Sequence, residues 1–405
     1  MYQVGWHAGW FVKIVDCTTF VIGNPPPHHG GRYFIVVKLT TDDGVVGHGE
    51  IYVATVAPQV VATMVDDVAG RWVIGADPRR LELLTRRIAS SGYALRPDPT
   101  IGGITSGIEI ACWDIVGKQL GAPISDLLGG VVHERLRTYT YLYPTPELPD
   151  VYTDPDQAAT RALEEVEAGF TAVKLDPAGP YTAFDGHQPS LEDLERSEAM
   201  VRAVRDAVGD RADILIGTHG QFTASGARRV ARRLERYEPL WFEEPTQPAR
   251  PRAMATVAES TTIPIATGER LTTIDEFADL ARHRAASIWQ PNLGRCGGIL
   301  AAKKIAAIAE ANDCQLAPHL YSGPILGAAN LQLACTVPNL LIVEGIRDWG
   351  GFHADLLTRP VRWEAGYATP SSEPGLGTGL DETVARAHPY DGDELHLSMV
   401  DHPVR

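Results

Sequence analysis

Three segments between residues 213 and 270 share one pattern, and they decide the fold: Asp213-Ile-Leu-Ile-Gly217-Thr-His219-Gly220, Pro239-Leu-Trp-Phe-Glu243-Glu244-Pro245 and Ile263-Pro-Ile-Ala-Thr-Gly-Glu269-Arg270. In each segment a short apolar run ends in a polar residue. This is typical of a buried parallel strand that carries a functional side chain at its C-terminal end. Positions 217, 243 and 269 are evenly spaced, at about the length of one strand, one loop and one helix. We therefore predict successive β/α units.

In a barrel of such units the C-terminal ends of the strands meet at one mouth, where functional residues usually lie. Glu243 and Glu269 would then lie close together there. Two like charges tolerate that proximity only with a cation between them. The pattern thus predicts a metal site.

The composition is that of a globular protein of 405 residues, with 44% apolar and 21% charged residues. No apolar run reaches the ~18 residues that a membrane helix needs, and Met1 to Trp10 is too polar for a signal peptide, so we expect a cytoplasmic protein. The formal net charge of −15 excludes nucleic acid and anionic membranes as partners. The five scattered cysteines predict buried free thiols.

The chain before residue 136 does not alternate strand and helix. Residues 11–53 read as antiparallel strands, and the Pro- and Gly-rich loop 23–32 suits a lid, in which we interpret His28 and His29 as solvated. Helices follow, and Ser106 with Glu109 predicts a capping box at the start of the last one. We therefore expect an α+β capping domain over residues 1–136.

From residue 137 the β/α alternation runs to residue 356 and gives eight strands, which is a closed barrel. Residues 357–405 lose the alternation and are expected to return to the capping domain. The predicted fold class is α/β, a modified (β/α)8 TIM barrel with an α+β capping domain built from the N-terminal part and the C-terminal segment. The strand ends carry a set of polar residues: Lys174, Asp176, His219, Glu243, Glu269, Asn292, His319 and Glu344.

These motifs resemble the enolase superfamily, in its mandelate racemase and muconate lactonizing enzyme family and the galactonate dehydratase-like branch. The segments that carry the resemblance are Phe242-Glu-Glu-Pro245, Ala266-Thr-Gly-Glu-Arg270, Gln290-Pro-Asn292 with Gly297-Gly298, and Ala317-Pro-His319. The resemblance implies that one Mg2+ per subunit holds a substrate carboxylate while a base removes the α-proton. It also implies a small-molecule carboxylate as partner, and we expect a homo-oligomer.

The family's roles map onto this chain residue by residue. The resemblance implies that Glu243 and Glu269 are metal ligands and that His319 is the base. It also implies that Glu344 and Lys174 hold the substrate carboxylate, and that His219 protonates the departing hydroxyl. Residues of the surrounding loops and strand ends are expected to bind the rest of the substrate: His29, Arg32, Tyr52, Tyr143 and Trp289.

The sequence departs from the family pattern at three positions. Gly217 stands where the family has its first metal-binding Asp, and Asp176 stands where it has a second lysine. Adjacent strands lie about 4.8 Å apart, so Asp176 could replace the missing ligand, although pairing with Lys174 is an alternative. Asn292 replaces the Asp that partners the catalytic His, which predicts a weaker base at His319.

The candidate functions follow from these residues. Racemisation needs a base on each face of the α-carbon, whereas dehydration needs one base and one acid, which His319 and His219 supply. We therefore expect an acid-sugar dehydratase that yields a 2-keto-3-deoxy acid. A racemase, epimerase or cycloisomerase of a related acid is the alternative, and a non-catalytic acid-sugar-binding barrel is the second alternative.

Overall fold

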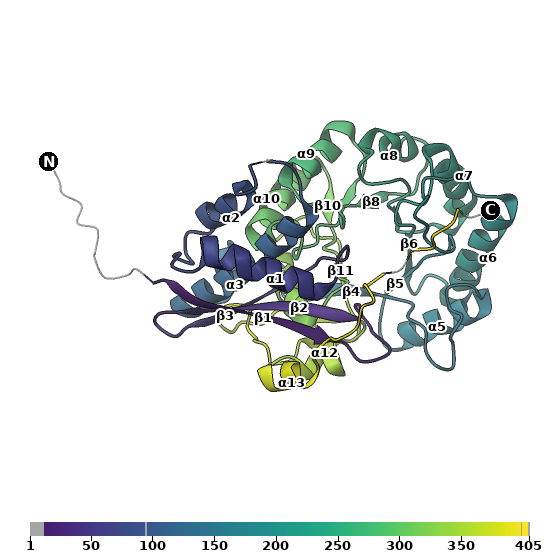
Figure 1. The fold of residues 1–405 in the computed structure, drawn as a ribbon. Helices are drawn as coiled ribbons and strands as arrows, with labels where there is room; N and C mark the ends of the chain where they lie inside the picture. Colours follow the sequence, from purple (N-terminus) through teal and green to yellow (C-terminus); the bar gives the residue numbers. More distant parts are fainter. Residues whose placement is uncertain (1–11, 94, 398, 404–405) are drawn as a thin grey trace.

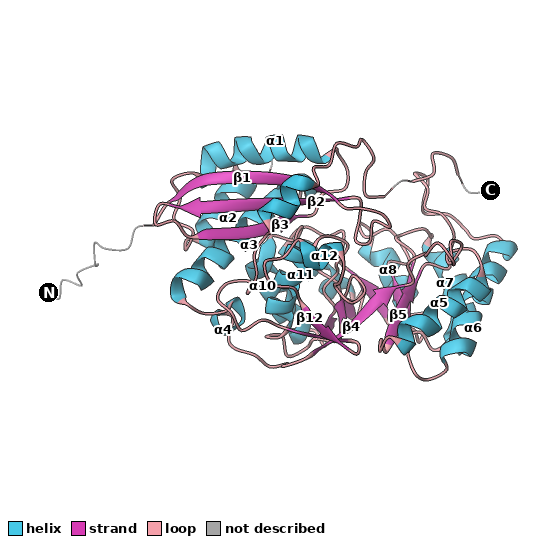
Figure 2. Ribbon diagram, turned by 90° about the horizontal axis from the view of Figure 1, so that it is seen from below, coloured by secondary structure: helices cyan, strands magenta, loops and turns pink. Residues whose placement is uncertain are grey.

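The computed structural model describes residues 12–93, 95–397 and 399–403; the segment 1–11, for which we expect no signal peptide, lies outside this range. The chain begins with an antiparallel sheet in the order β1-β2-β3, formed by β1 (Ile14–Gly23), β2 (Tyr33–Thr41) and β3 (Val46–Ile51). Figure 2 shows this sheet beside α1 (Pro58–Val68). The predicted strands of residues 11–53 are therefore present.

Helices cover this sheet: η1 (Ala69–Val73), α2 (Leu81–Ser90) and α3 (Pro99–Leu120), followed by the short α4 (Ile124–Leu127). The long helix α3 approaches β3 closely because both lack side chains at the contact. A Cβ on Gly49 would overlap the backbone oxygen of Gly107. Glycine is thus required at position 49 for the helix to pack on the sheet.

The predicted capping box at Ser106 is wrong. Helix α3 begins at Pro99, and the side chain of Asp98 accepts its first free backbone N–H groups. Ser106 and Glu109 lie buried inside the helix. The carboxylate of Glu109 instead accepts the N–H groups of Ile299 and Leu300 at 2.7 and 2.9 Å, so it caps a helix of the other domain.

The barrel consists of eight parallel strands: β4 (Leu136–Tyr141), β5 (Ala172–Leu175), β6 (Asp213–Gly217), β7 (Trp241–Glu243), β8 (Ile265–Thr267), β9 (Ile288–Trp289), β10 (Gln315–Leu316) and β11 (Val343–Glu344). Each strand from β4 to β10 pairs with the next. Strand β11 pairs with β4, and a bridge between Leu316 and Leu340 joins β10 to the last segment. The barrel predicted from the sequence is therefore closed.

The helices of the barrel surround these strands (Figure 1): α5 (Pro155–Glu167), α6 (Leu191–Val208), α7 (Ala224–Leu234) with η2 (Glu235–Tyr237), α8 (Pro251–Ala258), α9 (Ile274–His283), α10 (Gly298–Ala311) and α11 (Pro324–Ala334). The predicted capping box of Thr273 and Glu276 at the start of α9 is confirmed. No helix in the described ranges is long and apolar enough to cross a membrane. The five cysteines are free thiols, and all except Cys17 are buried.

The C-terminal segment contacts both domains. After α12 (Phe352–Asp355), strands β12 (Arg362–Glu364) and β13 (Tyr367–Thr369) pair with each other, and β13 pairs with barrel strand β4. Beyond α13 (Glu382–Ala387), Pro389 bridges to Ile22 of β1. The segment therefore first extends the barrel sheet and only then reaches the capping sheet.

Candidate active site

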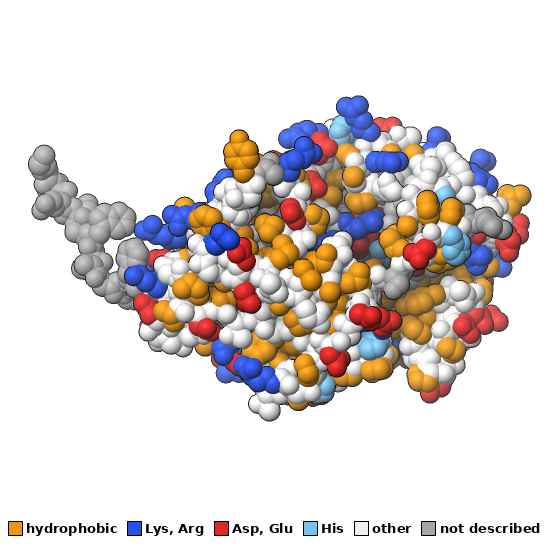
Figure 3. All heavy atoms as spheres, in the orientation of Figure 1, with side chains coloured by type: hydrophobic (Ala, Val, Ile, Leu, Met, Phe, Trp, Pro, Cys, Tyr) orange, Lys and Arg blue, Asp and Glu red, His pale blue; other side chains and the backbone are white. Residues whose placement is uncertain are grey.

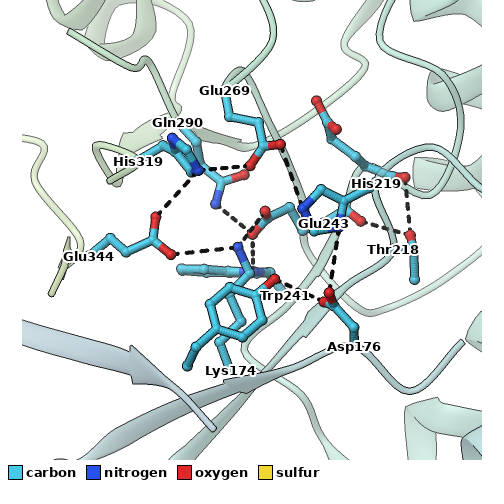
Figure 4. A network of polar contacts seen from close by, with 12 residues as sticks. Lys174, Asp176, Thr218, His219, Trp241, Glu243, Glu269, Gln290, His319 and Glu344 are labelled. Carbon is cyan, nitrogen blue, oxygen red and sulfur yellow. Dashed lines mark hydrogen bonds and ion pairs between the residues drawn. The ribbon is translucent and has the colours of Figure 1, made fainter. Parts of the chain in front are cut away.

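Glu243 lies at the end of β7 in the centre of the polar cluster that Figure 4 shows. Its Oε1 is 2.5 Å from Nζ of Lys174, and its Oε2 accepts N–H groups of Trp241 at 3.0 Å and Gln290 at 2.7 Å. Burial raises the pKa of Glu243 to about 7, although the charge of Lys174 acts in the opposite direction. Both oxygens of this carboxylate thus already contact N–H donors.

Lys174 lies between two carboxylates. Besides Glu243, its Nζ is 3.9 Å from Oε1 of Glu344 at the end of β11. Burial alone would lower the pKa of Lys174, but the charge of Glu243 and then that of Glu344 raise it above its usual value. The site therefore contains a buried ammonium group, which can attract a substrate carboxylate.

Glu269 lies between the two histidines at the ends of β6 and β10. Its Oε2 is 3.2 Å from Nε2 of His319, and its Oε1 is 3.7 Å from Nε2 of His219. Burial raises the pKa of Glu269, but attraction to the protonated forms of His319 and then His219 lowers it more, so the net direction is down. Glu269 is thus an anion, and its Oε2 has no hydrogen-bond partner among the described residues.

His319 is buried, with 5% of its surface exposed, and contacts the residue that replaces the family's Asp. Its Nδ1 lies 2.8 Å from Nδ2 of Asn292. Burial lowers the pKa of His319 to about 4, which the carboxylate of Glu269 only partly opposes. The imidazole is therefore neutral at pH 7.

Asp176 follows β5 and lies at the edge of the cluster. Its Oδ1 accepts the hydroxyl of Tyr141 at 2.9 Å, its Oδ2 accepts the hydroxyl of Tyr181, and Oδ2 is 3.6 Å from Nδ1 of His219. A Cβ built on Gly217 would overlap Oδ1 of Asp176. The carboxylate thus fills the space that the missing side chain leaves.

The carboxylate oxygens of the cluster are of the chemical type that binds a divalent cation. Carboxylate oxygens are the ligands that Mg2+ prefers, and the unpartnered, buried Oε2 of Glu269 is an anionic oxygen in need of a positive partner. The carboxylates are nevertheless not gathered around one point, because His219 lies between Asp176 and Glu269. Within the described ranges no three acidic, histidine or cysteine side chains are placed to hold an ion together.

The five residues expected to bind the rest of the substrate lie in different places. Tyr52 is close to the cluster, with its ring centroid 5.8 Å from that of His319. His29 packs on Tyr143 at 4.6 Å, and Arg32 pairs with Glu394 at 2.6 Å. These positions leave their predicted role open.

Trp289 does not fit the predicted contact with substrate. Its indole N–H donates to the backbone oxygen of Ala286, and its ring packs on Phe277 of α9. The neighbouring Ile288 faces the barrel interior, so the alternation of side chains along β9 turns Trp289 toward the helices. The direction of the Trp289 side chain could not be predicted from the sequence, because both faces of a barrel strand are apolar.

Several residues of the site were not predicted from the sequence. Trp241 precedes Glu243 by two positions and therefore lies on the same face of β7, a signal that the period of a strand provides. Gln290 binds the same carboxylate from β9, and Tyr141 of β4 binds Asp176. These contacts join different strands and depend on the closure of the barrel.

The C-terminal strap, residues 394–397 and 399–400, lies over the mouth of the barrel. Val400 donates its N–H to the backbone oxygen of Tyr181 at 2.8 Å and accepts the N–H of Ala183 at 3.1 Å. His396 is buried and stacks on Tyr33 of the capping sheet, with ring centroids 3.9 Å apart. Figure 1 shows this end of the chain crossing from the capping sheet to the side of α6.

The surroundings of the mouth are of mixed charge. A cleft of about 1260 Å3 opens between the α2–α3 loop and the segments that follow β7 and β8. Arg270, which follows Glu269 in the chain, lines this cleft, but the clustered site residues do not. Arg270 is paired with Glu244 at 2.6 Å. Acidic and basic side chains alternate over the face drawn in Figure 3. The net negative charge of the chain thus does not form one acidic patch on this face.

A closed β/α barrel with a capping domain, whose mouth combines carboxylates, a buried lysine and two histidines, defines a class of enzymes that act next to a carboxylate. Comparison with known families agrees. A model of the mandelate racemase/muconate lactonizing enzyme N-terminal domain matches residues 28–129, and an enolase C-terminal domain-like model matches residues 157–384. The chain belongs to the mandelate racemase/muconate lactonizing enzyme family.

Similar proteins include sugar-acid dehydratases, which are hydro-lyases. The chain is 34% identical to the D-galactonate dehydratase of Ralstonia nicotianae over 86% of its length and 89% of that protein. It is 32% identical to the D-gluconate/D-galactonate dehydratase of Picrophilus torridus over 88% of its length and 89% of that protein. Members of this superfamily generally use a divalent metal ion, usually Mg2+.

Solved structures of the same family superimpose closely. A protein of the mandelate racemase/muconate lactonizing enzyme type from Labrenzia alexandrii has 59% identity and a TM-score of 0.94, covering 96% of this chain and 99% of that one. The corresponding protein from Jannaschia sp. has 48% identity and a TM-score of 0.92, covering 95% and 100%. These similarities establish the fold class that the sequence predicts.

Proposed function

We propose that the protein is an acid-sugar dehydratase, which removes the α-proton and the β-hydroxyl of a sugar acid to give a 2-keto-3-deoxy acid. The observation that carries this proposal is the pair His219 and His319, which flank Glu269 from two strands of one buried mouth. Two histidines in one buried site can supply proton transfer and a hydrogen bond to the substrate, which suits the loss of water. The dehydratase names of the relatives support the same reaction.

Each step has candidate residues in this chain. Lys174 binds the substrate carboxylate with its buried ammonium group, assisted by Glu344, which accepts the N–H of Leu320 at 2.8 Å and is thereby fixed in place. One histidine takes the α-proton and the departing hydroxyl receives a proton. The family resemblance assigns the first task to His319 and the second to His219.

A divalent cation belongs to this proposal. Glu243 and Glu269 would hold one Mg2+, whose charge would stabilise the negative charge that develops on the substrate carboxylate. Asp176, in place of the ligand missing at Gly217, would reach the same ion only if His219 moved from between Asp176 and Glu269. The ion's affinity should be weak, because Glu243 already contacts three N–H donors. Glu269 is the stronger of the two candidate ligands.

A screen of sugar acids tests the function. We expect the purified protein with Mg2+ to convert at least one of D-galactonate, D-gluconate and D-xylonate, the substrates that the names of similar enzymes give, into a 2-keto acid detected by mass spectrometry. A racemase or epimerase would instead exchange the α-proton with deuterium from solvent without loss of water. A binding protein would retain the acid and do neither, and either result would refute the dehydratase.

A further inference from the structure

The amide of Asn292 has a fixed orientation. Its Oδ1 lies 2.9 Å from the backbone N–H of Gly294, and a backbone N–H only donates, so the atom that faces Gly294 must be the oxygen. The amide nitrogen Nδ2 therefore faces His319, 2.8 Å from its Nδ1. Asn292 and His319 are both buried, which keeps the amide in this contact.

This orientation determines where His319 carries its proton. An amide nitrogen only donates, so Nδ1 must be the acceptor, and a neutral imidazole then has its single N–H on Nε2. On the other side of the ring, Nε2 lies 3.2 Å from Oε2 of the Glu269 carboxylate, which only accepts. This proximity is compatible with an N–H on Nε2, but it is not a hydrogen bond, so the contact with Asn292 alone determines the Nε2–H tautomer.

We propose that Asn292 fixes His319 as the Nε2–H tautomer, so that His319 donates a hydrogen bond to the substrate and does not remove the α-proton. An Asp at position 292 would accept a proton from Nδ1 and leave the lone pair of Nε2 free for a base. The amide imposes the opposite arrangement. The inference rests on the proposed function, and it changes the role that the family resemblance gives to His319.

The α-proton base is then His219, whose surroundings are the reverse of those of His319. Its Nδ1 lies 3.6 Å from Oδ2 of Asp176, and its Nε2 lies 3.7 Å from Oε1 of Glu269. Both of its neighbours are carboxylates, whereas His319 has an amide at its Nδ1. Asp176 thus takes for His219 the place that an acidic partner has beside a catalytic histidine.

One histidine is sufficient for both proton transfers. Nε2 of His219 takes the α-proton, and the electron pair of the C–H bond forms the double bond of the enediolate. The carbon–oxygen bond at the β-carbon then breaks, and the same proton passes from His219 to the departing oxygen. Water and an enol leave, the enol becomes the 2-keto acid, and His219 is neutral again. Throughout, His319 keeps its proton and hydrogen-bonds the charged oxygen of the enediolate.

Nitrogen NMR of the full chain labelled with 15N-histidine tests the tautomer without any substrate. The His319 signals are identified by their loss in His319→Gln. We expect a protonated Nε2 and an unprotonated Nδ1 in the wild type, and the exchanged pattern in Asn292→Asp. A wild-type spectrum with the proton on Nδ1 overturns the proposal, whether or not the protein is a dehydratase.

Two matched variants test the roles on whichever sugar acid is turned over. Gln places an N–H near the position of Nε2 and has no basic nitrogen, so His319→Gln should lower turnover less than His219→Gln does. His219→Gln should lose at least about 100-fold, the usual contribution of a general base. The reverse pattern would return the base to His319. If no sugar acid is converted, the proposed function fails while the NMR result still decides the tautomer.

Discussion

The carboxylate of Asp176 fills the space in which a side chain at position 217 would begin. A Cβ on Gly217 would overlap Oδ1 of Asp176 and lie 3.0 Å from the hydroxyl of Tyr141, which donates to that same oxygen. An acidic side chain from β6 and one from the end of β5 are therefore mutually exclusive here. The glycine and the aspartate form one compensating pair.

A swap of the two residues tests this relationship. Gly217→Asp alone should destabilise the fold, because the new side chain and Asp176 compete for one space. Gly217→Asp combined with Asp176→Gly should recover the melting temperature, because the second change removes the overlap. Equal melting temperatures for the single and double variants would show that the two positions are independent.

Metal binding gives a second test of Asp176. If its carboxylate is a ligand, Asp176→Asn should weaken Mg2+ binding by at least about tenfold in calorimetry, on the order of 1.4 kcal/mol. Tyr181→Phe is the matched control, since it removes the hydroxyl bonded to Asp176 but no carboxylate. Unchanged affinity in Asp176→Asn would leave water to fill the position.

The same calorimetry distinguishes the contributions of Glu269 and Glu243 to Mg2+ binding. Glu269→Gln should abolish Mg2+ binding, because it removes the anionic oxygen that has no other hydrogen-bond partner in the described structure. Glu243→Gln should have the smaller effect, because three N–H donors already contact that carboxylate. If both variants bind Mg2+ like the wild type, the ion is not held here.

The barrel could be predicted from the sequence because its strands repeat at the length of one β/α unit and end in polar residues, as at Glu243 and Glu269. The start of α3 at Pro99 could not be predicted, because the apparent capping box of Ser106 and Glu109 has the same residue pattern as a true capping box. Only the contact of Glu109 with Ile299, 190 positions along the chain, distinguishes them. Rules based on neighbouring residues cannot identify a partner so far away in the chain.

The candidate site, like the fold, could be predicted from the sequence only in part. The strand-end residues could be named because each follows an apolar run, and the two anomalies, Gly217 and Asn292, could be noticed as departures from a family pattern. Their consequences could not be predicted. The overlap at Gly217 involves Asp176 of another strand end, and the local turn that brings the N–H of Gly294 to Asn292 has no signal in the residue pattern. The contact of Val400 with Tyr181 likewise has no signal in either segment alone.

The contact of Glu109 with α10 predicts a large effect on stability. The helix begins at Gly298, its N-cap residue Gly297 makes no side-chain cap, and the Glu109 carboxylate accepts the N–H groups of Ile299 and Leu300. Glu109→Ala leaves these buried donors unpaired, which should cost about 2 kcal/mol or more in urea unfolding. Glu310→Ala, an exposed change on the same helix, is the control and should change the free energy of unfolding little.

The buried histidines predict acid sensitivity. Burial lowers the pKa of His48 and His353 to about 4 and that of His396 to about 3, below the ~6.5 of the unfolded chain. Between the lowered pKa values and pH 6.5 the unfolded state binds more protons than the folded state does. The stability that is present above pH 6.5 is therefore lost as the pH falls. Each residue should contribute about 2 kcal/mol of loss by pH 5. His48→Gln should reduce the loss measured by urea unfolding at pH 7 and pH 5, whereas the exposed His402→Gln should not.

The strap predicts how His219 is shielded from solvent. Val400 donates its N–H to the backbone oxygen of Tyr181, whose ring centroid is 4.5 Å from that of His219 and whose hydroxyl bonds Asp176. Val400→Pro removes that N–H, while Val400→Ala keeps it. The proline variant should therefore release the loop that carries Tyr181, and His219 should react several-fold faster with diethyl pyrocarbonate, followed by mass spectrometry of its peptide. The exposed His402 is the internal control and should react at the same rate in the wild type and in both Val400 variants. Equal rates at His219 in the two variants would show that the strap does not hold Tyr181 over the mouth. If the melting temperature is unchanged, a difference in the rate at His219 reflects local release of the loop and not unfolding of the protein.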